Sequence, residues 1–393
     1  MKKYLIAFLT ILCIGIKSPL AVTSQNIILY NLNDDNVLYE KNSHEKVSIA
    51  SLTKIMTATV ALENISDLSE KVIITSKDFL ETDGYAKAGF KKGDIVTFED
   101  LLYGILLPSG AEAVNATINN TLKENFVIEM NNIAKKIGLE NTSFENPIGK
   151  DNDNNYSTAD DVAKLLKYAL KNPEFKKIFT TKKYTTSNGL VLNSTLNRYS
   201  DVFDTNKIIG AKSGFTKNAG RCLASITTLN DVNYLLVVLN ADQSIPSNAI
   251  KDSLEIYEYY DENYSYQIIL DKDEVLKSVP IKFSKEKYYD IKGHENISKY
   301  LLNNTKDNLK IVYDGKDEID YKMAKGTLLG EIKIYDGENL LAKENVYLEK
   351  NITYYPLEIW FLVIVIVSIL IIFIIPALLT KRTTSTSSKQ ETE

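Results

Sequence analysis

Histidine is scarce in this chain: its 393 residues include only His44 and His294. One lies just upstream of the first candidate motif and the other in a distant polar stretch, which leaves little for a Ser-His-Asp triad or for a metal site built on two histidines. A nucleophilic serine would therefore need a different base, and lysine is the best available one. We expect neither a metal nor another cofactor.

Cysteine is equally rare, and Cys222 remains alone once the expected export signal, which contains Cys13, is removed. A single cysteine in an exported protein cannot form an internal disulfide, so stability must come from packing. Cys222 stands in the alternating segment 220–225 with no histidine near it in the sequence. This position favours a core residue over a nucleophile.

Basic residues are outnumbered by acidic ones, 46 to 51, which gives a formal net charge of -5. Removal of residues 1–24 would take away Lys2, Lys3 and Lys17 and move this charge from -5 to -8. Such acidity disfavours nucleic acid as a partner.

Both ends of the chain carry an apolar segment. The first, Tyr4–Ile16, follows two lysines and ends at Lys17, too early for a membrane span. This is the pattern of a secretory signal, so we expect residues 1–24 to be a signal peptide. The mature protein would then be exported.

The second apolar segment, 359–379, has 21 residues without a charge, which as a helix cover about 30 Å, the thickness of a hydrocarbon core. The alternative of a buried core helix fits less well with Trp360 at the entry and Lys381-Arg382 beyond the exit. We expect a single-pass anchor in the cell membrane. The basic residues place the tail 380–393 in the cytoplasm and the rest of the chain outside.

Between these segments, residues 25–262 mix helical and strand patterns. A hairpin pattern covers 26–41, an apolar helix is expected over 51–64 and an amphipathic helix over 160–172. Strand patterns and a further helix over 247–259 follow. This order fits an α+β domain in which helices flank an antiparallel sheet.

From about residue 263 the pattern changes to short alternating runs, separated by turns such as Asp314-Gly315 and Asp336-Gly337. These features are typical of a small all-β domain. We expect this domain over 263–350 and a linker over 351–358 before the membrane helix.

The strongest chemical motif is Ser51-Leu52-Thr53-Lys54. On a helix, Ser51 and Lys54 lie one turn apart on one face, so the lysine amine can take the serine proton. The same spacing recurs at 43–46 and 284–287, but in polar segments. Only Ser51 begins an apolar helix, whose positive end favours an anion. Lys54 must be neutral, which needs burial and repulsion from a second cation, for which Lys212 is the candidate.

Residues 49–58 resemble the active-site segment of the low-molecular-mass penicillin-binding proteins, the serine D-alanyl-D-alanine carboxypeptidases. Further stretches agree with the family in the same order: 93–97, 99–110, Asn146-Pro147, 156–159 and 210–223. The resemblance covers about residues 25–262 strongly and continues weakly to about 350.

The resemblance implies a β-lactamase/transpeptidase-like α/β (α+β) fold and an acyl-enzyme. In this family Ser51 would be the acylated nucleophile, Lys54 its base, and Ser109 a hydroxyl that relays a proton or contacts Lys54. The substrate would be the peptidoglycan stem peptide, from which the terminal D-alanine is removed. β-Lactams would be covalent inhibitors.

The resemblance also implies a binding segment for the substrate carboxylate, Lys212-Ser213-Gly214-Phe215. Lys212 and Ser213 would bind the carboxylate, since a cation there selects peptides with a free C-terminus. The backbone N–H groups of Ser51 and Phe215 would form the oxyanion hole.

The chain departs from the family in its second motif, where Ser109-Gly110-Ala111 replaces the usual Ser-x-Asn. Ala111 lacks the amide that would contact the substrate. Ser109 also has an alternative role, because Ser109 and Glu112 have the spacing of a helix capping box.

Two other functions remain open. A β-lactamase would need a carboxylate for deacylation, and Glu145 is the tempting candidate, although its surroundings match carboxypeptidases. A catalytically weak wall-binding or β-lactam-sensing protein is suggested by Ala111 and the membrane segment. The short tail, without a signalling domain, weakens the sensor hypothesis.

Overall fold

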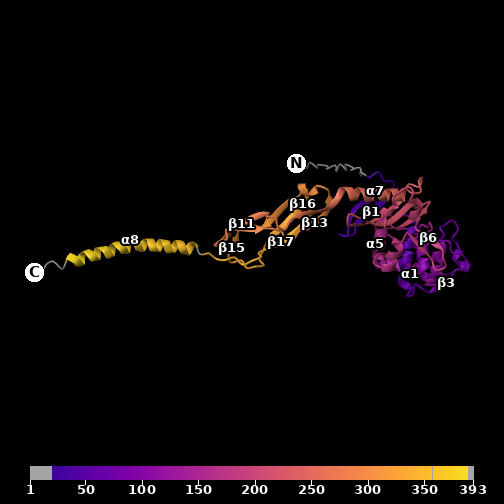
Figure 1. The fold of residues 1–393 in the computed structure, drawn as a ribbon, viewed down its shortest axis with the longest axis horizontal. Coiled ribbons are helices and arrows are strands. Elements are labelled where there is room, and N and C mark those ends of the chain that lie inside the picture. The colour runs from indigo at the N-terminus through magenta and orange to yellow at the C-terminus, as the bar shows by residue number, and fades with distance from the viewer. Residues whose placement is uncertain (1–19, 356, 388–393) are drawn as a thin grey trace, which may run out of the picture. The chain divides into compact units, whose positions relative to one another are not determined.

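The computed structural model describes residues 20–355 and 357–387, so most of the expected signal peptide and the last residues of the tail lie outside it. The chain divides into two compact units, an N-terminal unit up to Glu262 and a β-rich unit from Asn263 (Figure 1). The bounds expected for the individual domains stay predictions.

A five-stranded antiparallel sheet forms the centre of the N-terminal unit, in the order β2-β1-β9-β8-β7. The expected hairpin is β1 and β2, and β1 is buried along its whole length. β7 lies at one edge, paired with β8 so that Lys212 is opposite Ala224. The strands are β1 (Asn26–Asn31), β2 (Asn36–Lys41), β7 (Gly210–Thr216), β8 (Gly220–Leu229) and β9 (Val232–Ala241).

Helices cover both faces of this sheet. On one face α5 packs against β1, β8 and β9, and the buried helix α1 contacts α2, α3, α4, α5 and α6. On the other face Tyr257 of α7 shares a hydrogen bond of 2.9 Å with Ser225 of β8. The helices are α1 (Thr53–Asn64), α2 (Phe98–Leu106), α3 (Ala111–Asn119), α4 (Phe126–Lys136), α5 (Ala159–Ala169), α6 (Pro173–Thr180) and α7 (Asn248–Asn263).

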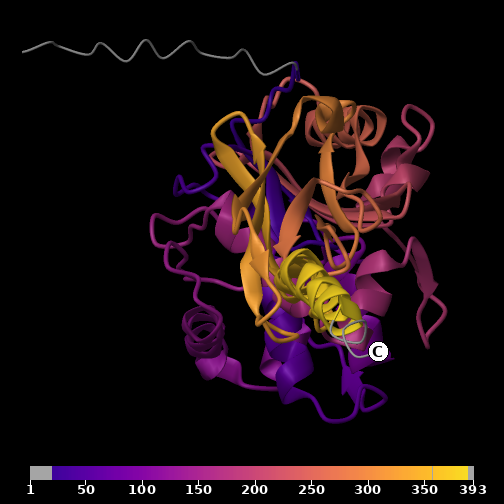
Figure 2. The ribbon, with the colours of Figure 1, turned by 90° about the vertical axis from the view of Figure 1, so that its left-hand side faces the viewer.

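The expected α+β architecture is confirmed by this arrangement. Two further small two-stranded sheets of the N-terminal unit pair β3 (Lys71–Ile73) with β4 (Ile95–Thr97) and β5 (Lys183–Thr185) with β6 (Val191–Asn193). Figure 2 shows the ribbon from a second direction.

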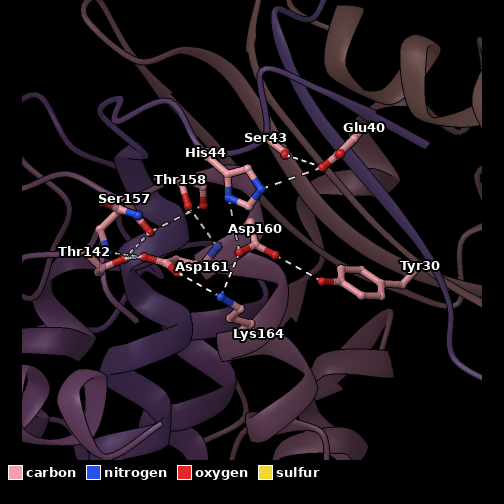
Figure 3. A network of polar contacts seen from close by, with 11 residues as sticks. Tyr30, Glu40, Ser43, His44, Thr142, Ser157, Thr158, Asp160, Asp161 and Lys164 are labelled. Carbon is pink, nitrogen blue, oxygen red and sulfur yellow. Dashed lines mark hydrogen bonds and ion pairs between the residues drawn. The ribbon is translucent and has the colours of Figure 1, made fainter. Parts of the chain in front are cut away.

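A network of polar contacts holds the segment before Ser51 against α5 (Figure 3). The Asp160 carboxylate accepts a hydrogen bond of 3.1 Å from Tyr30 and lies 2.8 Å from the Lys164 amine and 3.5 Å from His44. The backbone of Val47 pairs with that of Ser157. The chain is therefore fixed on α5 a few residues before the nucleophile candidate.

The neighbouring Asp161 completes this network from inside. Its carboxylate accepts hydrogen bonds of 2.8 Å from the Asn141 backbone and the Thr142 hydroxyl. Its own N–H donates to Thr158, the N-cap of α5. Because the carboxylate is buried, every one of these bonds replaces a bond to water that folding removes.

The β-rich unit consists of three small sheets, β10-β13, β12-β11-β15 and β14-β16-β17, around a core of its own. The expected all-β character is confirmed. The strands are β10 (Tyr264–Leu270), β11 (Lys277–Lys282), β12 (Tyr288–Ile291), β13 (Ile297–Leu302), β14 (Lys310–Gly315), β15 (Ile319–Asp320), β16 (Leu328–Asp336) and β17 (Asn339–Tyr347).

The last element is helix α8 (Leu357–Ser387). Its stretch Ile359–Pro376 is long and apolar enough to cross a membrane by length and composition, and none of it is buried in the protein. A core helix would be covered by other elements. This observation agrees with the expected membrane segment.

We expect Asp161→Ala to lower the free energy of unfolding by about 2 kcal/mol, because two partly buried donors lose their buried acceptor. Thermal unfolding followed by circular dichroism measures the change. Asp83→Ala is the matched control, since Asp83 is fully exposed and, in the part of the chain that the structure describes, its only ion pair is with Lys87. An equal melting temperature for both variants would contradict the structural role of Asp161.

Candidate active site

Ser51 and Lys54 meet at the start of α1. Ser51 lies in a 3-10 turn (Ala50–Leu52) that leads directly into the helix, so the α-helix itself begins at Thr53, two residues later than the sequence predicted. The Lys54 amine donates a hydrogen bond of 3.1 Å to the Ser51 hydroxyl. The Lys54 side chain is 1% exposed. The geometry is that of a serine with an adjacent, desolvated base.

A turn formed by residues 146–149 holds the lysine in place. The Ile148 carbonyl accepts a second hydrogen bond, of 2.6 Å, from the Lys54 amine. The Asn146 side chain braces the turn by accepting bonds of 2.8 Å from the N–H groups of Gly149 and Lys150. The sequence marked Asn146-Pro147 as part of the resemblance but gave no sign that a carbonyl beside it contacts Lys54.

Two glycines permit the close approach of three backbones at Ser51. A Cβ on Gly149, whose φ is +87°, would lie 2.0 Å from the Ala50 carbonyl oxygen. A Cβ on Gly214 of β7 would lie 3.1 Å from the Ser51 nitrogen. Ala50 itself has a positive φ of 47°, which is costly for alanine. The site therefore depends on backbone packing that no other residue type allows.

Burial lowers the pKa of Lys54 to about 7, and the negative charge of Glu112 opposes this shift. A substantial fraction of the amine is thus neutral near pH 7, as a general base requires. The second cation proposed from the sequence, Lys212, is not among the causes of this shift. Instead, burial lowers the pKa of Lys212 well below its usual value, and the charge on Lys54 lowers it further.

Ser109 lies in a strained turn before α3, with a φ of +71°. The capping-box role is wrong: the N-cap of α3 is Gly110, and Glu112 instead accepts a bond of 2.8 Å from the Gly89 backbone. Among the described residues, the buried Ser109 hydroxyl has no hydrogen-bond partner. It is left available to a substrate or to a proton relay. Ala111 is fully buried.

The edge strand β7 supplies the other candidate residues. Ser213 donates a hydrogen bond of 2.8 Å to Thr195. Phe215 is exposed, and its ring is covered by the Arg221 guanidinium, 3.7 Å from the ring centre. Lys212 is 0% exposed, so its amine lies beneath the surface of the site rather than in the open cleft.

One cleft of about 270 Å³ brings these residues together. Its lining includes Ser51, Ser109, Ser213, Gly214 and Phe215, while Lys54 and Lys212 lie buried behind it. The sequence analysis missed several further polar groups in this lining, among them Arg198 and Thr195. Only the fold reveals them, because the 3-10 segment Thr195–Tyr199 has no motif of its own.

Carboxylates are absent from the described lining of this cleft, and Glu145 is an exposed residue outside it. The candidate that a β-lactamase would need is therefore not in the site. Cys222 contributes to the lining but is 1% exposed, and burial raises the pKa of its thiol to about 12. It is a core residue, as expected, and not a nucleophile.

Comparison with known proteins agrees with this geometry. Residues 15–243 match the family model of the peptidase S11 group, D-alanyl-D-alanine carboxypeptidase. Residues 264–354 match that of the penicillin-binding protein 5 C-terminal domain. D-alanyl-D-alanine carboxypeptidase DacF of Bacillus subtilis is 27% identical over 84% of this chain and 86% of its own length. The carboxypeptidase of Streptomyces sp. K15 is 32% identical over 63% of this chain and 91% of its own.

Solved structures show the same fold. Penicillin-binding protein 5 of Haemophilus influenzae superposes with a TM-score of 0.62 over 85% of this chain and 99% of that one, at 22% identity. The Streptomyces K15 DD-transpeptidase superposes with a TM-score of 0.53 over 61% of this chain and 97% of that one, at 28% identity. Because the S11 match spans more than half of the chain and includes most of the residues that line the Ser51 cleft, this protein belongs to the D-alanyl-D-alanine carboxypeptidase family of serine peptidases.

Proposed function

We propose that Ser51 performs acyl transfer from a peptide ending in D-alanyl-D-alanine. The observation that carries this proposal is the buried Lys54 amine, which lies 3.1 Å from the Ser51 hydroxyl and whose pKa is lowered to about 7. Lys54 takes the hydroxyl proton while Ser51 Oγ bonds to the carbonyl carbon of the penultimate D-alanine. The C–N bond then breaks, and the terminal D-alanine leaves with a proton on its nitrogen.

Water completes the cycle by attacking the ester, which releases the shortened stem peptide and restores the Ser51 hydroxyl. The backbone N–H groups of Ser51 and Phe215 are the proposed oxyanion hole, and the close approach at Gly214 supports a pocket between them. The Ser109 hydroxyl would pass a proton to the leaving amine, and its lack of a hydrogen-bond partner among the described residues supports this role. β-Lactams would stop the cycle at the ester stage.

The terminal carboxylate of the substrate needs positive charge and hydrogen-bond donors. We propose that Ser213 and the exposed Arg198 guanidinium contact it from the cleft, and that Lys212 acts from beneath. Charge on an arriving carboxylate would favour the protonated form of the buried Lys212 amine. The missing amide at Ala111 leaves recognition more dependent on this carboxylate contact.

The proposed location is the outer surface of the cell membrane, with α8 as a single-pass anchor. The apolar stretch Ile359–Pro376 supports this proposal, and the Lys381-Arg382 pair supports a cytoplasmic tail. Such an anchor would hold the enzyme next to newly exported peptidoglycan.

Ser51→Ala should abolish covalent labelling by penicillin, since it removes the nucleophile. Intact-protein mass spectrometry detects the adduct, and peptide mapping locates it. Ser43→Ala, which changes the first serine of another Ser-x-x-Lys spacing, is the control and should label normally. An adduct on Ser43 or Ser284 in the Ser51→Ala protein would refute the assignment.

The acylation rate should rise with pH through a midpoint near 7, because only neutral Lys54 accepts the proton. Glu112 raises the Lys54 pKa, so Glu112→Gln should move this midpoint to lower pH. Stopped-flow acylation across pH 5 to about 9 measures the midpoint. Glu145→Gln, outside the cleft, is the matched control.

Lys54→Arg, which cannot deprotonate, should lose acylation. A near-normal acylation rate in this variant would exclude Lys54 as the base.

Arg198→Ala should lower kcat/KM for a D-Ala-D-Ala peptide acid by about tenfold to 100-fold, the scale of a lost charge-assisted hydrogen bond. Lys212→Ala should cost at least about 2 kcal/mol in transition-state stabilisation. The C-terminally amidated peptide should lose much less in both variants. Lys183→Ala, an exposed lysine outside the cleft, is the charge control. Equal losses of kcat/KM for the peptide acid and the amidated peptide would show that neither residue binds the carboxylate.

A further inference from the structure

The end of the β-rich unit is tied to the chain immediately before α8. Ser284 forms an antiparallel bridge with Tyr354, and the Tyr355 N–H donates a hydrogen bond of 2.8 Å to the Phe283 carbonyl. Four residue steps lead from Tyr355 to Ile359, where the apolar stretch begins, and these span at most about 14 Å. If that stretch enters the bilayer, the Phe283 and Tyr355 contact must lie within reach of the lipid headgroups.

Aromatic side chains gather at this end. Tyr321 packs against Tyr354 in a tilted arrangement with ring centres 4.4 Å apart, and it meets Phe283 edge-on at 6.0 Å. Tyr354 and Tyr355 remain 44% and 40% exposed. Amphipathic rings of this kind are enriched at the level of lipid headgroups, where the ring is buried and the hydroxyl stays in water.

Three segments build this surface, which we call the juxtamembrane face: residues 282–287, 320–325 and 349–355. They are held together by strand pairing of Lys282 with Asp320, by a hydrogen bond of 2.9 Å from the Lys325 backbone to Asn351, and by the ion pair of Lys350 with Glu286 at 2.9 Å. Figure 1 labels β11 and β15 at the end of the unit from which the chain continues toward α8.

The charge of the juxtamembrane face is opposite to that of the whole protein. It contains six lysines and three acidic residues, a balance of +3, or +2 when Glu358 is included, against -5 for the chain. In the described part of the chain, Lys285, Lys287 and Lys322 form no ion pair. Free lysines beside a membrane are attracted to anionic lipids, each by about fivefold in affinity.

We propose that the juxtamembrane face binds the outer leaflet, with its lysines on anionic lipid headgroups and its tyrosines at the headgroup boundary. This inference rests on the proposed membrane anchoring by α8. A short tether alone leaves a domain free to swivel, whereas a second contact restricts its orientation relative to the bilayer. The anchor sets the distance of the β-rich unit from the membrane, and the juxtamembrane face sets its orientation.

Hydrogen–deuterium exchange on the full chain in lipid nanodiscs tests the contact. We expect exchange in residues 282–287 and 320–325 to slow by about fivefold or more in phosphatidylglycerol–phosphatidylcholine discs compared with phosphatidylcholine discs. The variant Lys285→Glu/Lys287→Glu/Lys322→Glu should lose this protection. The matched control, Lys299→Glu/Lys310→Glu/Lys343→Glu, reverses three exposed strand lysines of the same unit and should keep it.

Penicillin labelling and unchanged exchange in β16 report folding of both variants. Equal exchange in the two lipids, or the same loss of protection in the control variant, would overturn the contact alone. Failure of the full chain to remain in the nanodisc would overturn the anchor and the contact together. Penicillin labelling and peptide turnover test the Ser51 chemistry separately, so neither result is confused with a failure of the proposed activity.

Discussion

The burial of one lysine amine next to one serine hydroxyl is the constraint on which the site depends. An amine taken from water must either find a counter-charge or lower its pKa. Lys54 has neutral partners instead, the Ser51 hydroxyl and the Ile148 carbonyl, and its pKa falls to about 7. Because burial removes this amine from water, it favours the neutral form of the amine, and this neutral form makes the lysine a base.

Several features elsewhere in the N-terminal unit serve that burial. The polar network on Asp160 and Asp161 fixes the chain that leads to Ser51, and Gly149 and Gly214 let two other segments approach it without a side chain between them. The buried helix α1 places Lys54 inside the protein while its first turn keeps Ser51 at the cleft. The described lining of the cleft holds no carboxylate, the group that a β-lactamase would need to drive deacylation.

In the proposed function, the β-rich unit positions the enzyme at the membrane. It has its own core, and its last strands lead to an apolar helix that has no protein cover. The proposed lysines and tyrosines of the juxtamembrane face would make this unit a spacer with a defined orientation, in contrast to a flexible stalk.

The sequence by itself determined the α+β order of elements, the all-β unit, the apolar C-terminal helix and the pair Ser51 and Lys54, because each is encoded within a short stretch by periodicity or spacing. Tertiary structure decided what depends on distant segments meeting. The Ile148 carbonyl on Lys54, the position of Arg198 in the cleft and the full burial of Lys212 have no local signal. The capping-box hypothesis for Ser109 failed for the same reason: the close packing of Gly110 against Ala88 and Gly104, rather than local spacing, sets where α3 begins.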